Sequence, residues 1–230
     1  MNRSLIRPFA VICLLGLALA TQTQARDRRQ SQAGQFDFYV LSLSWSPSFC
    51  AETAERHSGR APRAECATGA YSFIVHGLWP QNEHGYPENC ERPAPRLSRA
   101  IVSAMLDLMV SPRLVYGEWD RHGTCSGLST RDYFAAIRKA RSQVTIPPQY
   151  RDPRKPLDVG PAAVEDAFVK ANPGLTTDDI AVECEADRLT EVRLCLSKDL
   201  KYRACPDVVR HSCRRDDVLM PPVSGEANPR

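Results

Sequence analysis

Two short segments hold the residues of this sequence that are best suited to chemistry. Residues 73–80 read FIVHGLWP and contain His76, and residues 118–125 read EWDRHGTC and contain Glu118 and His122. Imidazole has an unperturbed pKa of about 6.5, so it can take or give a proton near neutral pH. Two histidines with a carboxylate therefore predict general acid–base catalysis. Cleavage of an RNA phosphodiester needs such a pair, a base for the 2′-hydroxyl and an acid for the 5′-oxygen.

Other side chains near the two segments suit a phosphate and a base. Arg121 directly precedes His122 and is the candidate for stabilising a negatively charged phosphorane. Trp79, Gln81 and Tyr86 are the candidates for base contacts, because an aromatic face stacks on any base and an amide can hydrogen-bond to one. Trp79 suits a core position equally well.

The flanking sequence predicts the elements that hold these residues. His76 ends an apolar, β-branched run and precedes Gly77, which predicts a strand over residues 71–76 that stops at a turn. A helix over residues 118–123 would place Glu118 and His122 on one face, with Trp119 in the core. Further helices are expected at 96–110, 129–141 and 161–172, strands at 36–45, 180–184, 189–197 and 200–204, and loops at 50–66, 81–95 and 146–156.

The order of these elements predicts the fold class. Strands and helices mix without strict alternation, which favours an α+β fold with a central antiparallel sheet flanked by helices. The sequence shows no internal repeat and no second-domain boundary. We therefore expect one catalytic domain over residues 26–230, acting as a monomer.

The first residues and the cysteines predict export. Residues 1–25 have a basic start, an apolar run over 9–20 and small residues suited to cleavage, as in a secretory signal peptide. An uncleaved anchor is disfavoured because the run is too short for a membrane span. Of nine cysteines one, Cys13, lies in this segment, and the even remainder predicts disulfides in an oxidising compartment. The protein is expected in the periplasm or the medium, free of the membrane after cleavage.

The charge of the chain limits the kind of partner. The formal net charge is only +3, which excludes a strongly basic, histone-like nucleic-acid binder. Non-specific affinity through counterion release is expected to be modest.

The two segments resemble the active-site segments of the secreted ribonuclease T2 family. Their typical forms are [FT]-x-[IV]-H-G-L-W-P and H-E-W-x-[KR]-H-G-T-C. The first match is complete, and the second departs at its opening position, where Gly117 replaces a histidine. The resemblance spans residues 36–218. It implies an endoribonuclease that cleaves single-stranded RNA with low base specificity, with no metal or cofactor, and leaves DNA intact.

The resemblance also implies residue roles. His122 would be the general base and His76 the general acid, with Glu118 and Arg121 stabilising the phosphorane and a 2′,3′-cyclic phosphate preceding the 3′-phosphate. Gly117 predicts reduced but real activity. The implied disulfide pairs are Cys50–Cys66, Cys90–Cys125, Cys184–Cys213 and Cys195–Cys205.

Two alternatives belong to other classes of protein. A metallo-hydrolase would use Glu118, His122 and His76 as ligands, but the sequence has no H-E-x-x-H motif. A T2-like fold with weakened catalysis would bind RNA or another extracytoplasmic partner, and Gly117 is the only support for this alternative.

Overall fold

Strand β1 (Phe38–Trp45) forms the centre of the molecule, because apolar side chains occupy both of its faces. Tyr39, Leu41, Leu43 and Trp45 lie on one side and belong to the main core. That side is the buried face expected from the sequence. The computed structural model describes residues 31–56, 66 and 71–224. The predicted signal peptide, residues 1–25, lies outside the described residues.

The sheet has six strands in the order β2-β1-β5-β6-β3, with β4 also paired to β5. The remaining strands are β2 (Phe73–Gln81), β3 (Leu157–Val159), β4 (Ile180–Glu185), β5 (Arg188–Leu196) and β6 (Val218–Met220). Their pairings are antiparallel except for β5 with β6, which pair in parallel through Arg188 and Leu219. The α+β class is therefore confirmed, but the sheet is mixed. The long connection from β5 to β6, which includes α7 (Pro206–Val209), gives the crossover that a parallel pair requires.

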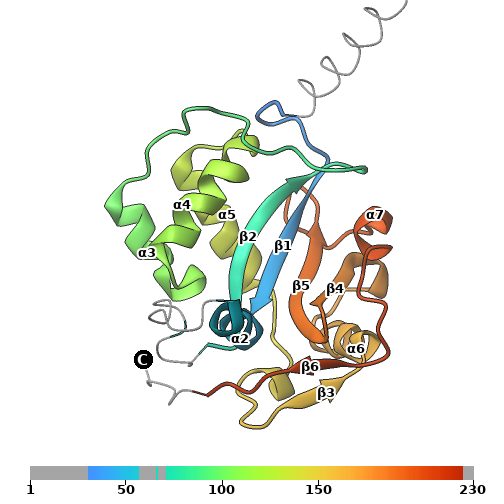
Figure 1. Cartoon of the computed structure of the whole chain (residues 1–230). Coiled ribbons are helices and arrows are strands. Elements are labelled where there is room, and N and C mark those ends of the chain that lie inside the picture. Colours follow the sequence, from blue (N-terminus) through green and yellow to red (C-terminus); the bar gives the residue numbers. More distant parts are fainter. Residues whose placement is uncertain (1–30, 57–65, 67–70, 225–230) are drawn as a thin grey trace, which may run out of the picture.

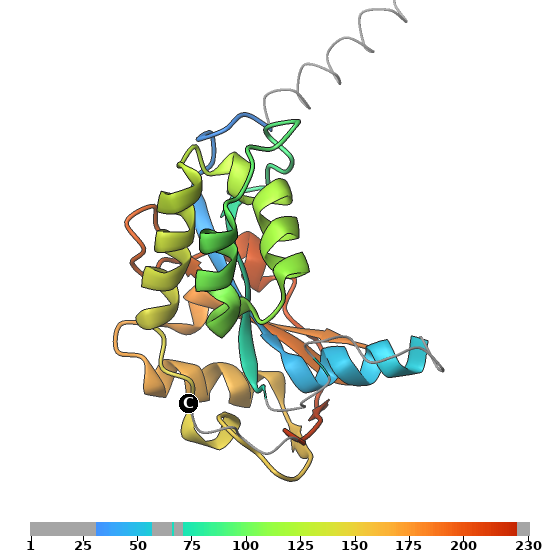
Figure 2. The ribbon, with the colours of Figure 1, turned by 90° about the vertical axis from the view of Figure 1, so that its left-hand side faces the viewer.

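Helices cover the main-core face of the sheet (Figures 1 and 2). α3, α4 and α5 lie beside β2, and α6 packs against β4. Their bounds are Arg99–Met109, Pro112–Arg121, Thr130–Ser142 and Pro161–Ala171, and short 3-10 turns occupy Gly123–Cys125, Pro148–Tyr150 and Thr177–Asp179. All four helices contribute apolar side chains to one core.

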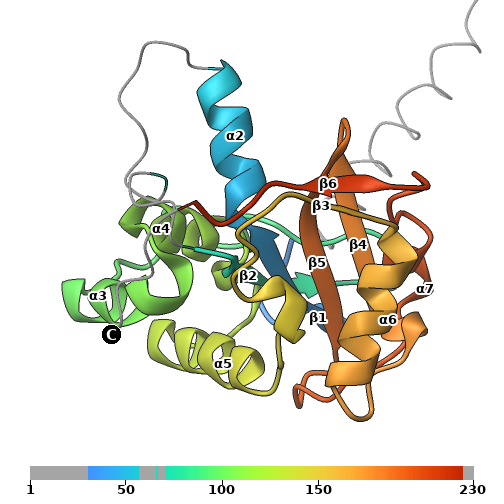
Figure 3. The same cartoon turned by 90° about the horizontal axis from the view of Figure 1, so that it is seen from below.

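Prolines account for two differences from the sequence-based expectation. Pro47 does not open a loop but lies in the first turn of α2 (Ser46–Arg56), which projects away from α5 and α6 (Figure 3). Pro112 likewise begins α4 behind the N-cap Ser111. A first-turn proline lacks an N–H that the helix does not use, so the same residue can end one element and begin the next.

Two expected strand boundaries were also wrong. β2 runs through His76 to Gln81 instead of stopping at a turn. The strand expected at 200–204 reduces to one bridge between Leu196 and Tyr202. In each case the chain continues or loses pairing according to its neighbour strand, which local sequence does not specify.

Four disulfides link the chain in the pairs that the family resemblance implied. They are Cys50–Cys66, Cys90–Cys125, Cys184–Cys213 and Cys195–Cys205. Cys90–Cys125 ties the loop that follows β2 to the turn that follows α4, and Asn89 N–H donates to the Arg121 carbonyl at 2.7 Å in the same place. The two predicted segments are therefore joined covalently.

The described residues were also compared with the requirements of a membrane span. No single helix among them has both the length and the apolar character to cross a bilayer. Only α3 together with the α4 region meets the length and composition criteria, and that pair is bent by 104°.

Candidate active site

His76 lies at a β-bulge. Opposite β1, Gly77 pairs with Ser42 and Val75 pairs with Leu43, so His76 is the extra residue between them. A bulge re-aims the side chains of its strand. Val75 stays in the main core, while His76 points to the opposite face of the sheet, together with Trp79.

Glu118 connects the helix to this strand. One turn before the end of α4, its side chain is only 6% exposed. Trp79 Nε1–H donates to its Oε2 at 2.7 Å, and His76 Nε2 lies 3.5 Å from its Oε1. A Cβ at Gly77 would overlap both the Glu118 carboxylate and the Trp79 indole. The glycine in the first segment is thus required by the close approach of α4 to β2.

His122 follows at the C-cap of α4, and its N–H donates to the Glu118 carbonyl at 3.0 Å, which keeps the two residues one turn apart as expected. Its ring stacks on Trp79 with centroids 5.2 Å apart, and the His76 ring meets the same indole edge-on at 5.2 Å. Gly123 is required next, because a Cβ there would overlap Trp119 and Tyr133. Trp119 is buried, as expected, and donates to the Pro95 carbonyl.

The two imidazoles have opposite protonation preferences. Burial, followed by the charges of Arg121 and His76, lowers the pKa of His122 to about 3. Burial also lowers the pKa of His76, but the hydrogen bond and charge of Glu191 and the charge of Glu118 outweigh it, so the pKa is raised. At neutral pH His122 is therefore neutral, while His76 favours its protonated form.

Two charged residues of β5 complete the surroundings of His76. Glu191 Oε1 lies 2.5 Å from His76 Nδ1, and Arg193 binds the other carboxylate oxygen with Nε at 2.9 Å. Arg193 also contacts Glu183 at 2.8 Å and lies over the Trp79 ring. Our sequence analysis missed Glu191 and Arg193. The signal was present, since two charged residues alternate with apolar ones in a strand that is otherwise buried.

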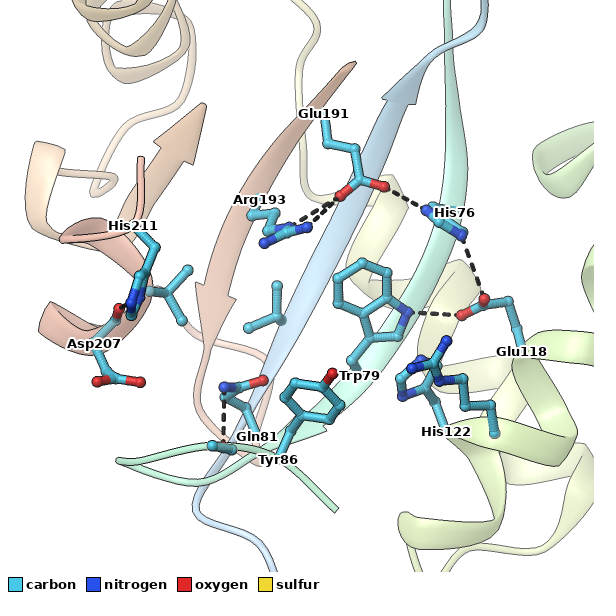
Figure 4. Close-up of a pocket in the computed structure, with 14 residues that line it drawn as sticks. His76, Trp79, Gln81, Tyr86, Glu118, His122, Glu191, Arg193, Asp207 and His211 are labelled. Carbon is cyan, nitrogen blue, oxygen red and sulfur yellow. Dashed lines mark hydrogen bonds and ion pairs between the residues drawn. The ribbon is translucent and has the colours of Figure 1, made fainter. Parts of the chain in front are cut away.

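All of these side chains line one cavity of about 590 Å³ (Figure 4). Every predicted catalytic, phosphate-stabilising and base-binding residue contributes to its wall. The lining residues are Val40, His76, Trp79, Gln81, Gly85, Tyr86, Glu118, Arg121, His122, Glu191, Arg193, Asp207, Val208 and His211. The structure thus brings together residues from β1, β2, α4, β5 and α7, which lie far apart in the sequence.

The candidate base-binding residues lie at the lower part of the cavity in Figure 4. Gln81 Nε2 donates to the Gly85 carbonyl at 3.0 Å, which fixes the amide orientation. Tyr86 is 50% exposed, and its ring lies 6.3 Å from that of His122. Trp79 is half-buried and forms the wall between the histidines rather than a core residue.

Arg121 reaches the cavity but has an acidic partner. Its Nε donates to Glu88 Oε2 at 2.6 Å, and both side chains are largely exposed. Gly117 is exposed and lines a smaller cavity of about 270 Å³ that His76 and Glu118 share. An added Cβ at Gly117 would meet nothing within 4 Å. A histidine at this position would therefore have room.

The possibility of a metal centre was assessed from the side chains themselves. No group of three or more His, Cys, Asp or Glu residues within the described ranges has an arrangement that could hold a metal ion. Glu118, His122 and His76 do not form such a group, although all three line the same cavity.

Known proteins resemble this chain in sequence. A profile of the ribonuclease T2 family matches residues 36–205. A ribonuclease of Aeromonas hydrophila is 40% identical over 123 residues, which is 54% of this chain and 53% of the relative. A probable ribonuclease of Haemophilus influenzae is 31% identical over 52% of this chain and 47% of its own length. The matches thus span about half the length of these two relatives. Ribonuclease DdI of Dictyostelium discoideum is 28% identical over 89% of this chain and 93% of its own length.

Solved structures agree on the fold. RNase NT in complex with 5′-AMP superposes with a TM-score of 0.62 at 24% identity, over 82% of this chain and 99% of that one. An RNase-related protein from Calystegia sepium gives a TM-score of 0.62 at 20% identity, over 81% and 97% of the two chains. Since the family profile covers most of the sequence and includes both histidine segments, the chain belongs to the ribonuclease T2 family.

Proposed function

We propose that the protein is a metal-independent endoribonuclease that cleaves single-stranded RNA with low base specificity. One observation carries the proposal: two imidazoles with opposite protonation preferences contact the same indole ring inside a single cavity. A neutral imidazole is ready to accept a proton and a protonated one is ready to give it, as acid–base cleavage requires.

In the first step neutral His122 removes the proton of the ribose 2′-hydroxyl. The 2′-oxygen attacks phosphorus, and the bond from phosphorus to the 5′-oxygen breaks. Protonated His76 donates its proton to that leaving oxygen, so the products are a 2′,3′-cyclic phosphate and a free 5′-hydroxyl. In the second, slower step the roles reverse: His76 takes a proton from water, and His122 returns one to the 2′-oxygen, which leaves a 3′-phosphate. DNA lacks the 2′-hydroxyl and is not a substrate.

Charge stabilisation of the phosphorane falls to Glu118 and Arg121. Burial raises the pKa of Glu118, against the opposing effects of the His76 charge and the Trp79 hydrogen bond. A carboxyl that shares a proton readily can hydrogen-bond to a phosphorane oxygen. Arg121 supplies positive charge once phosphate replaces Glu88 as its partner.

The cavity supports low base specificity. Tyr86 and Trp79 offer aromatic faces, which stack on any of the four bases. Gln81 has its amide nitrogen occupied by Gly85, so its oxygen is the atom available to a base. All of these groups come from one chain, so a monomer is sufficient for the reaction.

Four disulfides support export to an oxidising compartment, either the periplasm or the medium. The proposal therefore includes removal of residues 1–25 and a mature domain from residue 26 that is not anchored in a membrane.

A short RNA of defined sequence tests the proposal when its products are analysed by mass spectrometry in the presence of EDTA. We expect 2′,3′-cyclic phosphate ends that convert slowly to 3′-phosphates, and no cleavage of the matching DNA. His76→Ala and His122→Ala should each abolish cleavage. An EDTA-sensitive reaction would contradict metal independence. RNA binding without any cleavage by the wild-type protein would favour the alternative of a T2-like binding protein.

A further inference from the structure

Glu191 lies far from both histidine segments in the sequence and yet makes the shortest contact of His76. The two residues are 115 positions apart, and the His76 Nδ1 to Glu191 Oε1 distance is 2.5 Å. The contact leaves Nε2 as the ring nitrogen that faces Glu118, at 3.5 Å. With Nδ1 occupied by Glu191, the His76 ring has one orientation, and Nε2 is the atom free to reach a leaving group.

Glu191 is itself held from two sides. Arg193 donates to its Oε2 through both Nε and a terminal nitrogen at 2.9 Å, and the Ser44 hydroxyl donates to Oε1 at 3.4 Å. The carboxylate is 8% exposed and is held in the charged state, because the hydrogen bond and charges of His76 and Arg193 outweigh burial and lower its pKa. An ionised, immobile carboxylate is therefore in place before substrate binds.

Charged groups face His76 from two of the elements packed around it. Glu118 approaches from α4 at 3.5 Å, and Glu191 from β5 at 2.5 Å. Arg193 on β5 and His122 at the end of α4 act in the opposite sense, since each repels a proton on this ring. The His76 side chain is 35% exposed, so water screens part of these effects. The two carboxylates thus decide the balance, and Glu191 is the closer of them.

We propose that Glu191, clamped by Arg193, is a positioning residue that orients His76 and provides the negative charge against which the ring keeps its proton for the leaving 5′-oxygen. This inference rests on the proposed ribonuclease function. During cleavage Nε2 gives its proton to the oxygen as the phosphorus–oxygen bond breaks, and Nδ1 keeps its proton in the hydrogen bond to Glu191. The carboxylate neither gains nor loses a proton. In the second step the same charge stabilises the proton that Nε2 takes from water.

The test separates the charge of Glu191 from its shape. Glu191→Gln keeps the size and an oxygen that accepts from Nδ1–H, but it removes the charge. Glu183→Gln is the matched control, because Glu183 contacts the same Arg193 at 2.8 Å and makes no hydrogen bond or ion pair with His76 within the described part of the chain. Glu191→Asp keeps the charge.

The measurement is kcat/KM against pH on two substrates, a dinucleoside phosphate and a nucleoside 3′-phosphodiester whose p-nitrophenolate leaving group needs no proton. His76 acts protonated, so activity falls as pH rises through its pKa. Glu191→Gln should move this fall to lower pH by about one unit or more, a loss of about tenfold per unit above it. The loss should be much smaller on the p-nitrophenyl substrate, with KM unchanged, and Glu183→Gln should leave the profile in place.

Several results would overturn the inference. These are an unmoved alkaline limb in Glu191→Gln, an equal loss on both substrates, or an equal shift in Glu183→Gln. If Glu191→Gln does not fold, NMR titration of the His76 ring in Glu191→Asp decides: the pKa must stay above that of a free histidine, and a lower value refutes the role. Failure of the proposed function is distinct, because the wild-type protein would then cleave no RNA, or His76→Ala would keep full activity.

Discussion

The close approach of α4 to β2 at Gly77 allows a quantitative prediction for Gly77→Ala. The new methyl group would occupy the space of the Glu118 carboxylate and the Trp79 indole nitrogen, so the 2.7 Å hydrogen bond between them must break. A hydrogen bond to a charged group contributes about 1.5–3 kcal/mol, and overpacking costs about 1–3 kcal/mol more. Alanine recovers about 0.4–1 kcal/mol by restricting the unfolded chain. The net loss of stability should be about 2–5 kcal/mol.

Gly117→Ala is the matched control, one residue before Glu118 in the interior of α4. Its Cβ would meet nothing within 4 Å. Alanine is preferred over glycine inside a helix by about 0.5–1 kcal/mol, so this variant should be stabilised by that amount. The same chemical change is therefore expected to have opposite signs at two positions that flank one carboxylate.

Thermal unfolding followed by circular dichroism, with the disulfides intact, measures both variants. A change of 1 kcal/mol corresponds to about 2–4 °C in Tm for a chain of this size. Gly77→Ala should lower Tm by at least about 4 °C, with a loss of RNA cleavage, and Gly117→Ala should raise it by about 1–4 °C. A Gly77→Ala protein that melts with the wild type would refute the reasoning that Gly77 is required by contact with Glu118.

Three further predictions concern pH, phosphate binding and the disulfides. Since cleavage needs neutral His122 and protonated His76, with the pKa of His122 at about 3 and that of His76 raised by its neighbouring carboxylates, kcat/KM should be highest on the acid side of neutrality; a maximum above pH 8 would contradict this. Glu88→Gln releases Arg121 from its exposed ion pair, so KM for RNA should fall by up to about fivefold, and a higher KM would count against the phosphate role of Arg121. Replacing the Cys90–Cys125 bridge, which has a sequence separation of 35, with two serines should cost about 4 kcal/mol, and denaturant titration showing no loss would argue against it.

The sequence predicted the site residues better than the elements that carry them. His76, Glu118 and His122 could be selected because the chemistry they perform depends on residue type, and all three line the cavity. The bulge at His76 could not be predicted, since it depends on the register between β2 and β1. Trp79 fitted the core and the site equally well until the stacking on His122 was seen.

Long-range contacts account for what the sequence analysis missed. Glu191 and Arg193 reach His76 and Trp79 only because β5 lies on the far side of β1 from β2. Strand order is set by the whole fold rather than by local pattern, so two charged residues in a buried strand signal a special role without identifying the partner. The parallel joint between β5 and β6 was missed for the same reason.

Trp79 contacts four charged or ionisable groups at once, namely His76, His122, Glu118 and Arg193. Substitutions at any two of these positions share one indole as their common neighbour, so their kinetic effects should not multiply independently. The proton donor and the proton acceptor are thus one mechanical unit. An engineered or natural change in either histidine's surroundings is felt by the other, and a library that varies these positions one at a time would misjudge which combinations remain active.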